Sequence, residues 1–314
     1  MHLSKFAVAI IFLTLPLAIA VSQSKTIAER LGYPANSKLL IIHADDLAVA
    51  HSEDAASFEA LDKRAASSAS IMVPCPWLSE VADYAKAHPD ADLGLHLTLT
   101  SEWKTYRWGP IESKNRVPSL LDPLGMLWPS TELAAQNIKP ADAELELRAQ
   151  IEHAIAAGIR PTHIDSHMGV LFSRPELFSV YMKLAREYKL PFLAVRDPGV
   201  FPALQPLLSG KDLVLDSVVM ASPDVAQAEW RHFYVNAVSK LKPGVTELIV
   251  HLAYDNAEMQ AVAVDHPDYG SAWRQRDYDV VTSPEFKKAL QDNHVILIRW
   301  KDLGKLLSES AGHP

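Results

Sequence analysis

Short apolar runs alternate with amphipathic stretches along most of this chain. The run at 39–42 has no polar alternation and ends in His43-Ala44-Asp45-Asp46, and similar segments predict strands at 70–73, 93–100, 162–167, 192–195, 213–219, 247–252 and 295–300. Strands of this kind are typical of a parallel sheet that is covered on both faces. The stretches at 52–61, 76–87 and 141–157 have the spacing of helices instead.

This alternation predicts an α/β fold. We expect a (β/α) barrel of seven or eight parallel strands, closed or nearly closed and of the TIM-barrel type, in one domain over residues 38–310. The segment 101–139 interrupts the pattern, because it contains three tryptophans and several prolines without periodicity. A loop of that length usually has a function.

The start of the chain has a different character. Lys5 precedes an almost unbroken apolar stretch at 6–19, and Ala18-Ile19-Ala20 has the pattern of a signal-peptidase site. The stretch is shorter than the ~20 residues that span a bilayer. We therefore expect a secretory signal peptide at 1–20 rather than a stable membrane anchor, a linker at 21–37, and export to the periplasm or the exterior.

Composition narrows the class of protein further. The chain has 314 residues, of which 48% are hydrophobic and 22% charged, as in ordinary globular proteins. A net charge of −8 without a basic run makes nucleic acid an unexpected partner. Cys75 is the only cysteine, so an intrachain disulfide and a cysteine-based zinc cluster are both excluded. Nothing in the pattern indicates the oligomeric state.

Polar side chains cluster where predicted strands end. These positions are Asp45-Asp46, the pattern His163-x-Asp165-x-His167 and His251, with His96 nearby within its predicted strand. The carboxyl ends of parallel strands meet at one rim of such a barrel, so these groups are expected to converge there. Histidines combined with a carboxylate form a divalent-metal site with open positions for water and substrate.

Each residue taken singly also has a structural explanation. Asp45 and Asp46 are residues that often make turns or cap helices, and a buried histidine such as His43 is more often a hydrogen-bonded core residue than a ligand. His163 and Asp165 with the distant His251 also match the ligand set of non-haem iron oxygenases. Those enzymes usually have antiparallel barrels, which the strand–helix alternation argues against.

Three segments resemble the signatures of the YdjC-like carbohydrate deacetylases, the ChbG/HpnK family. They are the residues at 40–47 (LIIHADDL), at 93–100 (LGLHLTLT) and at 161–167 (PTHIDSH), in the same order and with similar separations. The stretch 274–290 is similar to the C-terminal part of that family. The chain departs from the family pattern at Ala48, where glycine is common, and at Asp54, where asparagine is common.

The resemblance implies a metal-dependent hydrolase that removes acetyl groups from N-acetylated sugars. Matched position by position, the metal ligands are Asp46, His96 and His167. Asp45 corresponds to the general base, which deprotonates the attacking water, and His251 to the acid, which protonates the departing amine.

The remaining assignments concern neighbouring groups and the metal. His163 and Asp165 are expected to orient the ligands from behind. The family is associated with Mg²⁺, whereas two imidazoles suit Zn²⁺ or another transition metal better, and both stay open.

The same resemblance predicts a carbohydrate partner. Trp103, Trp108 and Trp128 are candidates for stacking on sugar rings, although they equally suit a loop that packs on its own tryptophans. A secreted glycan-binding protein that has lost catalysis is the remaining alternative.

Overall fold

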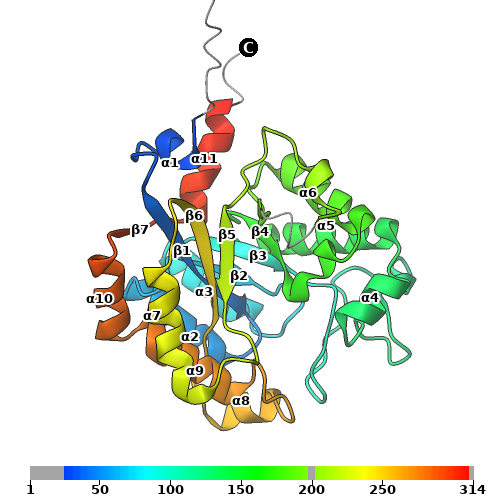
Figure 1. Ribbon diagram of the computed structural model, residues 1–314. Coiled ribbons are helices and arrows are strands. Elements are labelled where there is room, and N and C mark those ends of the chain that lie inside the picture. Colours follow the sequence, from blue (N-terminus) through cyan, green and yellow to red (C-terminus); the bar gives the residue numbers. More distant parts are fainter. Residues whose placement is uncertain (1–24, 197–201, 311–314) are drawn as a thin grey trace, which may run out of the picture.

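Seven parallel strands form one curled sheet (Figure 1). Six of them follow the order β4-β3-β2-β1-β6-β5, and β7 pairs with β1 beside this path. The computed structural model describes residues 25–196 and 202–310, so the predicted signal peptide at 1–20 lies outside the described residues. The strands are β1 (Lys38–Leu47), β2 (Ser68–Ile71), β3 (Leu93–Leu97), β4 (Ile164–Ser166), β5 (Ser217–Met220), β6 (Gly244–His251) and β7 (Val295–Leu297).

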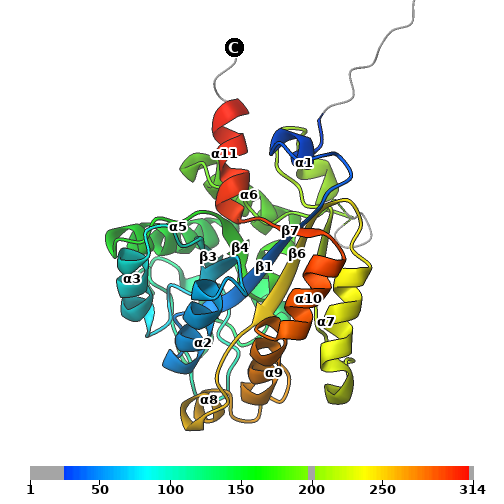
Figure 2. The ribbon, with the colours of Figure 1, turned by 90° about the vertical axis from the view of Figure 1, so that its left-hand side faces the viewer.

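Helices cover the outside of this sheet, as the two perpendicular views show (Figures 1 and 2). The α-helices are α1 (Ile27–Arg30), α2 (His51–Asp62), α3 (Leu78–Ala87), α4 (Thr131–Asn137), α5 (Pro140–Ala156), α6 (Pro175–Tyr188), α7 (Trp230–Ser239), α8 (Ala257–Val262), α9 (Ser271–Val281), α10 (Pro284–Asp292) and α11 (Trp300–Ser310). Four short 3₁₀ helices are η1 (Pro118–Leu120), η2 (His167–Phe172), η3 (Gln205–Leu207) and η4 (Gln227–Glu229). Within the described ranges, none of these helices combines the length and apolar character needed to cross a bilayer.

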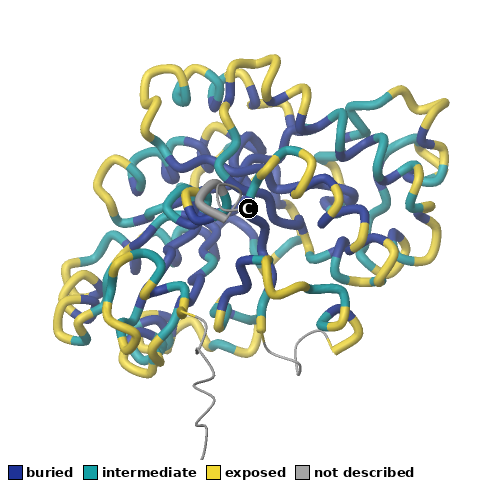
Figure 3. The backbone as a smooth tube through the Cα atoms, turned by 90° about the horizontal axis from the view of Figure 1, so that it is seen from above, coloured by how far each residue is buried: buried dark blue, intermediate teal, exposed yellow. Residues whose placement is uncertain are grey.

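The apolar strands occupy the centre of the molecule, with helices packed around the outside of the curled sheet. From Leu39 to Leu47 every residue of β1 is buried, and β2 and β3 are buried throughout. Figure 3 shows the same distribution, with buried backbone in the middle and exposed backbone at the periphery. The predicted parallel α/β architecture is therefore confirmed.

The prediction of a closed barrel with seven or eight strands is wrong. The edge strands β4 and β5 do not pair with each other, so the six-strand path forms a half-barrel. The predicted strand at 192–195 makes only isolated bridges, from Phe192 to Ile164 of β4 and from Val195 to Leu215 before β5. An isolated bridge aligns one residue pair and builds no continuous ladder, so this side of the sheet stays partly open.

The structure also adds detail to three local predictions. The helix predicted at 52–61 is α2, and its N-cap is Ala50; Ser52, where the predicted helix begins, donates from its hydroxyl to Asn256 at 2.8 Å. The segment 101–139 contains α4, because Ser130 caps that helix by accepting from the Leu133 amide at 3.2 Å. The predicted linker at 21–37 contains the short helix α1, which a capping box starts at Thr26.

Candidate active site and metal centre

A break in the regular pleat of β1 brings Asp45 and Asp46 to the same cavity. Consecutive residues of a regular strand point to opposite faces. Here the pairing of β1 with β2 changes register between Ala44 and Leu47, and Asp46 has the left-handed φ of 72°. Irregularities of this kind re-aim side chains next to active sites. Both carboxylates consequently line one cavity of about 630 Å³.

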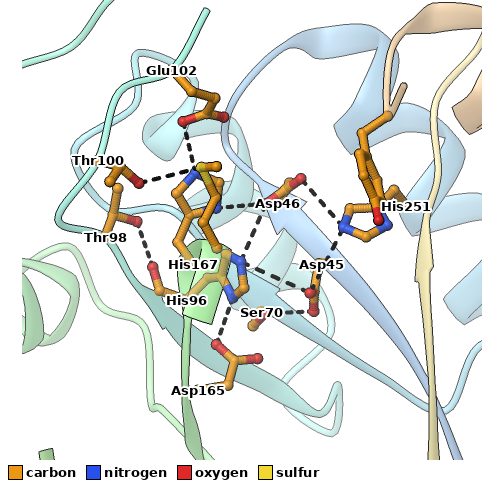
Figure 4. Close-up of polar contacts among 12 residues, drawn as sticks. Asp45, Asp46, Ser70, His96, Thr98, Thr100, Glu102, Asp165, His167 and His251 are labelled. Carbon is orange, nitrogen blue, oxygen red and sulfur yellow. Dashed lines mark hydrogen bonds and ion pairs between the residues drawn. The ribbon is translucent and has the colours of Figure 1, made fainter. Parts of the chain in front are cut away.

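Three side chains from different strand ends converge at this cavity (Figure 4). The Oδ1 atom of Asp46 lies 3.3 Å from Nε2 of His96 and 3.4 Å from Nδ1 of His167. All three side chains are buried, and their potential ligand atoms lie within 4.8 Å of one another. Asp46 Oδ1 has no hydrogen-bond partner among the described residues. A divalent cation would fit beside this buried carboxylate oxygen, which has no hydrogen-bond donor and is flanked by two imidazole nitrogens.

The second nitrogen of each imidazole is held by a carboxylate. His96 Nδ1 lies 2.6 Å from Asp165 Oδ1, and His167 Nε2 lies 3.1 Å from Glu102 Oε2. Metal-binding histidines commonly donate their other ring N–H to a carboxylate, which sets the tautomer and orients the ring. The donor set therefore fits a divalent cation.

Two further groups of side chains are close enough to hold a metal, but they fit one less well. One consists of His43, His163 and Asp165, and the other of Asp45, His96 and Asp165. Both use Asp165, whose two oxygens already contact His96 and His43 at 2.6 and 3.0 Å. His43 and His163 also do not line the cavity. His251 belongs to none of these groups, so the oxygenase-type set of His163, Asp165 and His251 is not assembled in the described structure.

Asp45 and His251 lie beside the three converging ligand atoms. The Nε2 atom of His251 is 4.0 Å from Asp45 Oδ2 and 3.9 Å from Asp46 Oδ2. Asp277 holds the end of β6 in place by accepting from the His251 backbone amide at 3.0 Å. Burial lowers the pKa of His251 to about 4, in spite of the nearby Asp46 carboxylate, so the ring is neutral near pH 7.

His43 is more than an ordinary core residue. Its Nε2 atom lies 3.0 Å from both Asp45 Oδ1 and Asp165 Oδ2, and it is completely buried. Burial alone would lower the pKa of His43, but the hydrogen bonds to Asp165 and Asp45 outweigh it and raise the pKa well above its ordinary value. His43 thus bridges the candidate base to the residue that holds His96.

The two residues expected behind the ligands take different positions. Asp165 contacts His96 directly, as described above. His163 lies deeper, with its ring stacked on Trp300 and 5.0 Å from the ring of His43, and burial holds its pKa well below the usual value. His163 therefore contacts the core rather than the candidate ligands.

The three tryptophans of segment 101–139 take different positions relative to the cavity. Trp103 lines the cavity, and the centroid of its ring lies 5.6 Å from the guanidinium carbon of Arg274, which stands over the ring. Trp108 donates from Nε1 to the Thr100 carbonyl at 2.8 Å, and Trp128 donates to the Ser119 carbonyl at 2.9 Å. Neither of these two lines the cavity, so their indoles hold the segment itself together.

Two site residues were not predicted as such from the sequence. Arg274 of α9 donates to Asp46 Oδ2 at 2.8 Å and pairs with the buried Glu53. Burial opposes ionisation of Asp46, but Arg274 and His167 outweigh it and hold its pKa well below the usual range. Glu102, which contacts His167, follows β3 without any distinguishing pattern. Arg274 lies in the C-terminal stretch that resembles the YdjC-like family, but no local pattern links it to Asp46.

Fold and site together define this protein as a parallel α/β half-barrel with a candidate metal centre. A parallel α/β half-barrel carries a His/Asp cluster at the carboxyl end of its strands, where α/β proteins bind their substrates.

The model of the YdjC-like protein family matches residues 39–292, so this chain belongs to that family. A carbohydrate deacetylase of Thermus thermophilus is 32% identical over 278 residues, which cover 86% of this chain and 96% of the relative. A carbohydrate deacetylase of Brevibacillus brevis is 28% identical over 276 residues, which cover 84% of this chain and 99% of the relative. The crystal structure of an Enterococcus faecalis protein assigned to cellobiose-phosphate cleavage is 25% identical, with a TM-score of 0.70 over 85% of this chain and 99% of that one.

Proposed function

We propose that this protein is a metal-dependent carbohydrate deacetylase that hydrolyses the amide of N-acetylated sugars. The observation that carries the proposal is the convergence of Asp46, His96 and His167 beside Asp45 and His251 on one cavity. The deacetylase names of the relatives in Thermus and Brevibacillus support it.

The residues of this chain divide the work of such a hydrolysis. Asp46, His96 and His167 would hold a divalent cation, which supplies Lewis acidity that polarises an amide carbonyl and acidifies a water molecule. Asp45 takes the proton of the attacking water, a role worth roughly 10²- to 10⁴-fold in rate. Asp45 then passes this proton to the neutral ring of His251, whose Nε2 lies 4.0 Å from Asp45 Oδ2, and His251 delivers it to the leaving amine.

The donor set bears on which cation is bound. Two imidazoles and one carboxylate suit Zn²⁺ or a neighbouring transition ion, whereas Mg²⁺ prefers oxygen ligands and keeps several waters. The chemistry of His96 and His167 therefore supports a transition ion over Mg²⁺.

The test is acetate release. The protein is incubated with N-acetylated chito-oligosaccharides, with added cations and with a chelator. We expect acetate with the wild type, loss of it with chelator, and loss in Asp45→Asn with the metal retained. Asp224→Asn changes an exposed carboxylate with no described contact and serves as the control. Tight sugar binding without acetate would contradict the proposal and favour a glycan-binding protein.

We also propose that the protein is exported. The support is the apolar stretch at 6–19 followed by Ala18-Ile19-Ala20. Fractionation of expressing cells and N-terminal sequencing of the product test this, and we expect the mature chain to begin at Val21. An uncleaved chain in the cytoplasm would contradict it.

A further inference from the structure

The cavity at the candidate metal centre is larger and more apolar than an acetyl group requires. Its volume is about 630 Å³, and its polar side chains are concentrated at one end, around Asp46 and His251. The opposite wall is apolar and comes from η2, β5, β6, residues 193–195 and residues 204–208. Representative residues of this wall are Phe172, Leu193, Leu204, Leu208, Val218 and Ile249.

This apolar wall extends well below the candidate ligands. Ser217 lines the cavity and pairs in register with Thr246, which lies five residues before His251 in β6. At ~3.3 Å per residue of a strand, the cavity reaches about 16 Å down from the level of His251. It runs along the side where β4 and β5 do not pair.

The few polar side chains on this wall already have partners inside the protein. Ser217 Oγ lies 2.8 Å from Thr246 Oγ1, and Gln205 donates to the Val195 carbonyl at 2.9 Å. Ser166 Oγ accepts from the Leu171 amide at 3.0 Å. A sugar placed against this wall would leave hydroxyl groups without partners, at a cost for each. Hydrocarbon, in contrast, gains from burial there.

The geometry of an amide decides which part of the substrate enters this space. The groups on the nitrogen and on the carbonyl carbon of a trans amide point in opposite directions. With the carbonyl beside Asp46 and His96, the sugar belongs at the polar end, which holds Glu102, Arg274 and Trp103. The alkyl part of the acyl group then points toward the apolar wall.

We propose that the cavity binds an acyl chain several carbons longer than acetyl. The preferred substrates are then amino sugars whose N-acyl group is several carbons longer than acetyl. This inference rests on the proposed amide hydrolysis at the same site. It adds that Phe172, Leu193 and Ile249 form a binding site for the chain.

An acyl-length series tests the inference directly. Initial rates of the wild type are measured on glucosamine carrying N-acetyl, N-butanoyl, N-hexanoyl or N-octanoyl groups. A fully buried methylene is worth about fourfold in kcat/KM, and we expect kcat/KM to rise by up to that factor per carbon until the cavity is filled. A fall in kcat/KM from acetyl onward would overturn the inference while leaving the proposed deacetylase intact.

A cavity-filling variant gives a second, independent measurement. Val218→Phe adds bulk at the apolar wall, and we expect the ratio of octanoyl to acetyl kcat/KM to fall at least tenfold. Ile155→Phe, at an exposed position of α5 outside the cavity, is the matched control and should leave the ratio unchanged. An unchanged ratio in a folded Val218→Phe protein would overturn the placement of the chain.

Binding separates this inference from the proposed reaction. Calorimetry with Asp45→Asn compares N-octanoyl- and N-acetylglucosamine without turnover. Tighter binding of the octanoyl compound, by at least tenfold, supports the acyl site even if no substrate is hydrolysed. Equal or weaker binding overturns it even if acetate release is found.

Discussion

Arg274 donates to Asp46 Oδ2 at 2.8 Å across 228 residues of sequence. The same guanidinium pairs with Glu53, and all three side chains are buried. Because Oδ2 is occupied in this way, Oδ1 is the oxygen that faces His96 and His167. Arg274 thus determines which oxygen of Asp46 is presented to a cation.

Removing this guanidinium should destabilise the whole protein. Arg274→Met leaves Asp46 and Glu53 as buried carboxylates without their cation, which typically costs about 3–5 kcal/mol. Urea unfolding measures the loss. Arg231→Met breaks the exposed pair with Glu285 and should cost less than about 1 kcal/mol, so equal losses for the two variants would contradict the interpretation.

Metal content should depend on His96. We expect His96→Ala to lose the metal and the activity but to keep the fold, because a chain of this size buries a large core without metal. Metal analysis after dialysis and circular dichroism measure both properties. His153→Ala, at an exposed position of α5, is the control. Retention of stoichiometric metal in His96→Ala would remove this residue from the ligand set.

His43 should affect turnover rather than metal content. In His43→Asn the contacts from Nε2 to Asp45 and Asp165, both 3.0 Å long, are lost. We expect kcat to fall about 10- to 100-fold, with KM and metal content nearly unchanged, as for other groups behind a metal site. His163→Asn removes a histidine that is equally buried but has no contact with Asp45. A similar loss of kcat there would indicate a general effect on the core.

The pH dependence of stability should carry the signature of Asp54. Burial raises its pKa to about 8, although the Ala48 amide donates to it, against 3.8 in the unfolded chain. Between these values the folded state binds more protons than the unfolded state, so this residue makes the free energy of unfolding fall as the pH rises from 4 to 8.

Asparagine at position 54 should remove that slope. Asparagine keeps an oxygen acceptor for the Ala48 amide and does not ionise. The free energy of unfolding of Asp54→Asn should therefore rise relative to that of the wild type by up to about 1.4 kcal/mol per pH unit in this window. Urea titrations of both proteins at pH 5, 6.5 and 8 measure the difference. Parallel pH profiles would show that the carboxyl group does not titrate in this range.

Much of the architecture was predictable because it depends on local pattern. Apolar runs such as the one that became β1 predict buried parallel strands, since only a covered sheet tolerates them. The closure of the sheet was not predictable. It depends on whether residues 192–195 build a ladder with β4 or only isolated bridges, which is decided by packing between distant segments.

The sequence by itself determined which residues stand at the ends of the parallel strands, and therefore that Asp46, His96 and His167 share one rim. The tertiary structure alone decided how they meet there. The register change in β1 points two consecutive aspartates into one cavity. Arg274 and Glu102 reach the site from distant segments, and His43 of β1 meets the distant Asp165. Strand periodicity is a local property that a sequence displays, whereas a contact between side chains far apart in the chain depends on the packing of the whole fold.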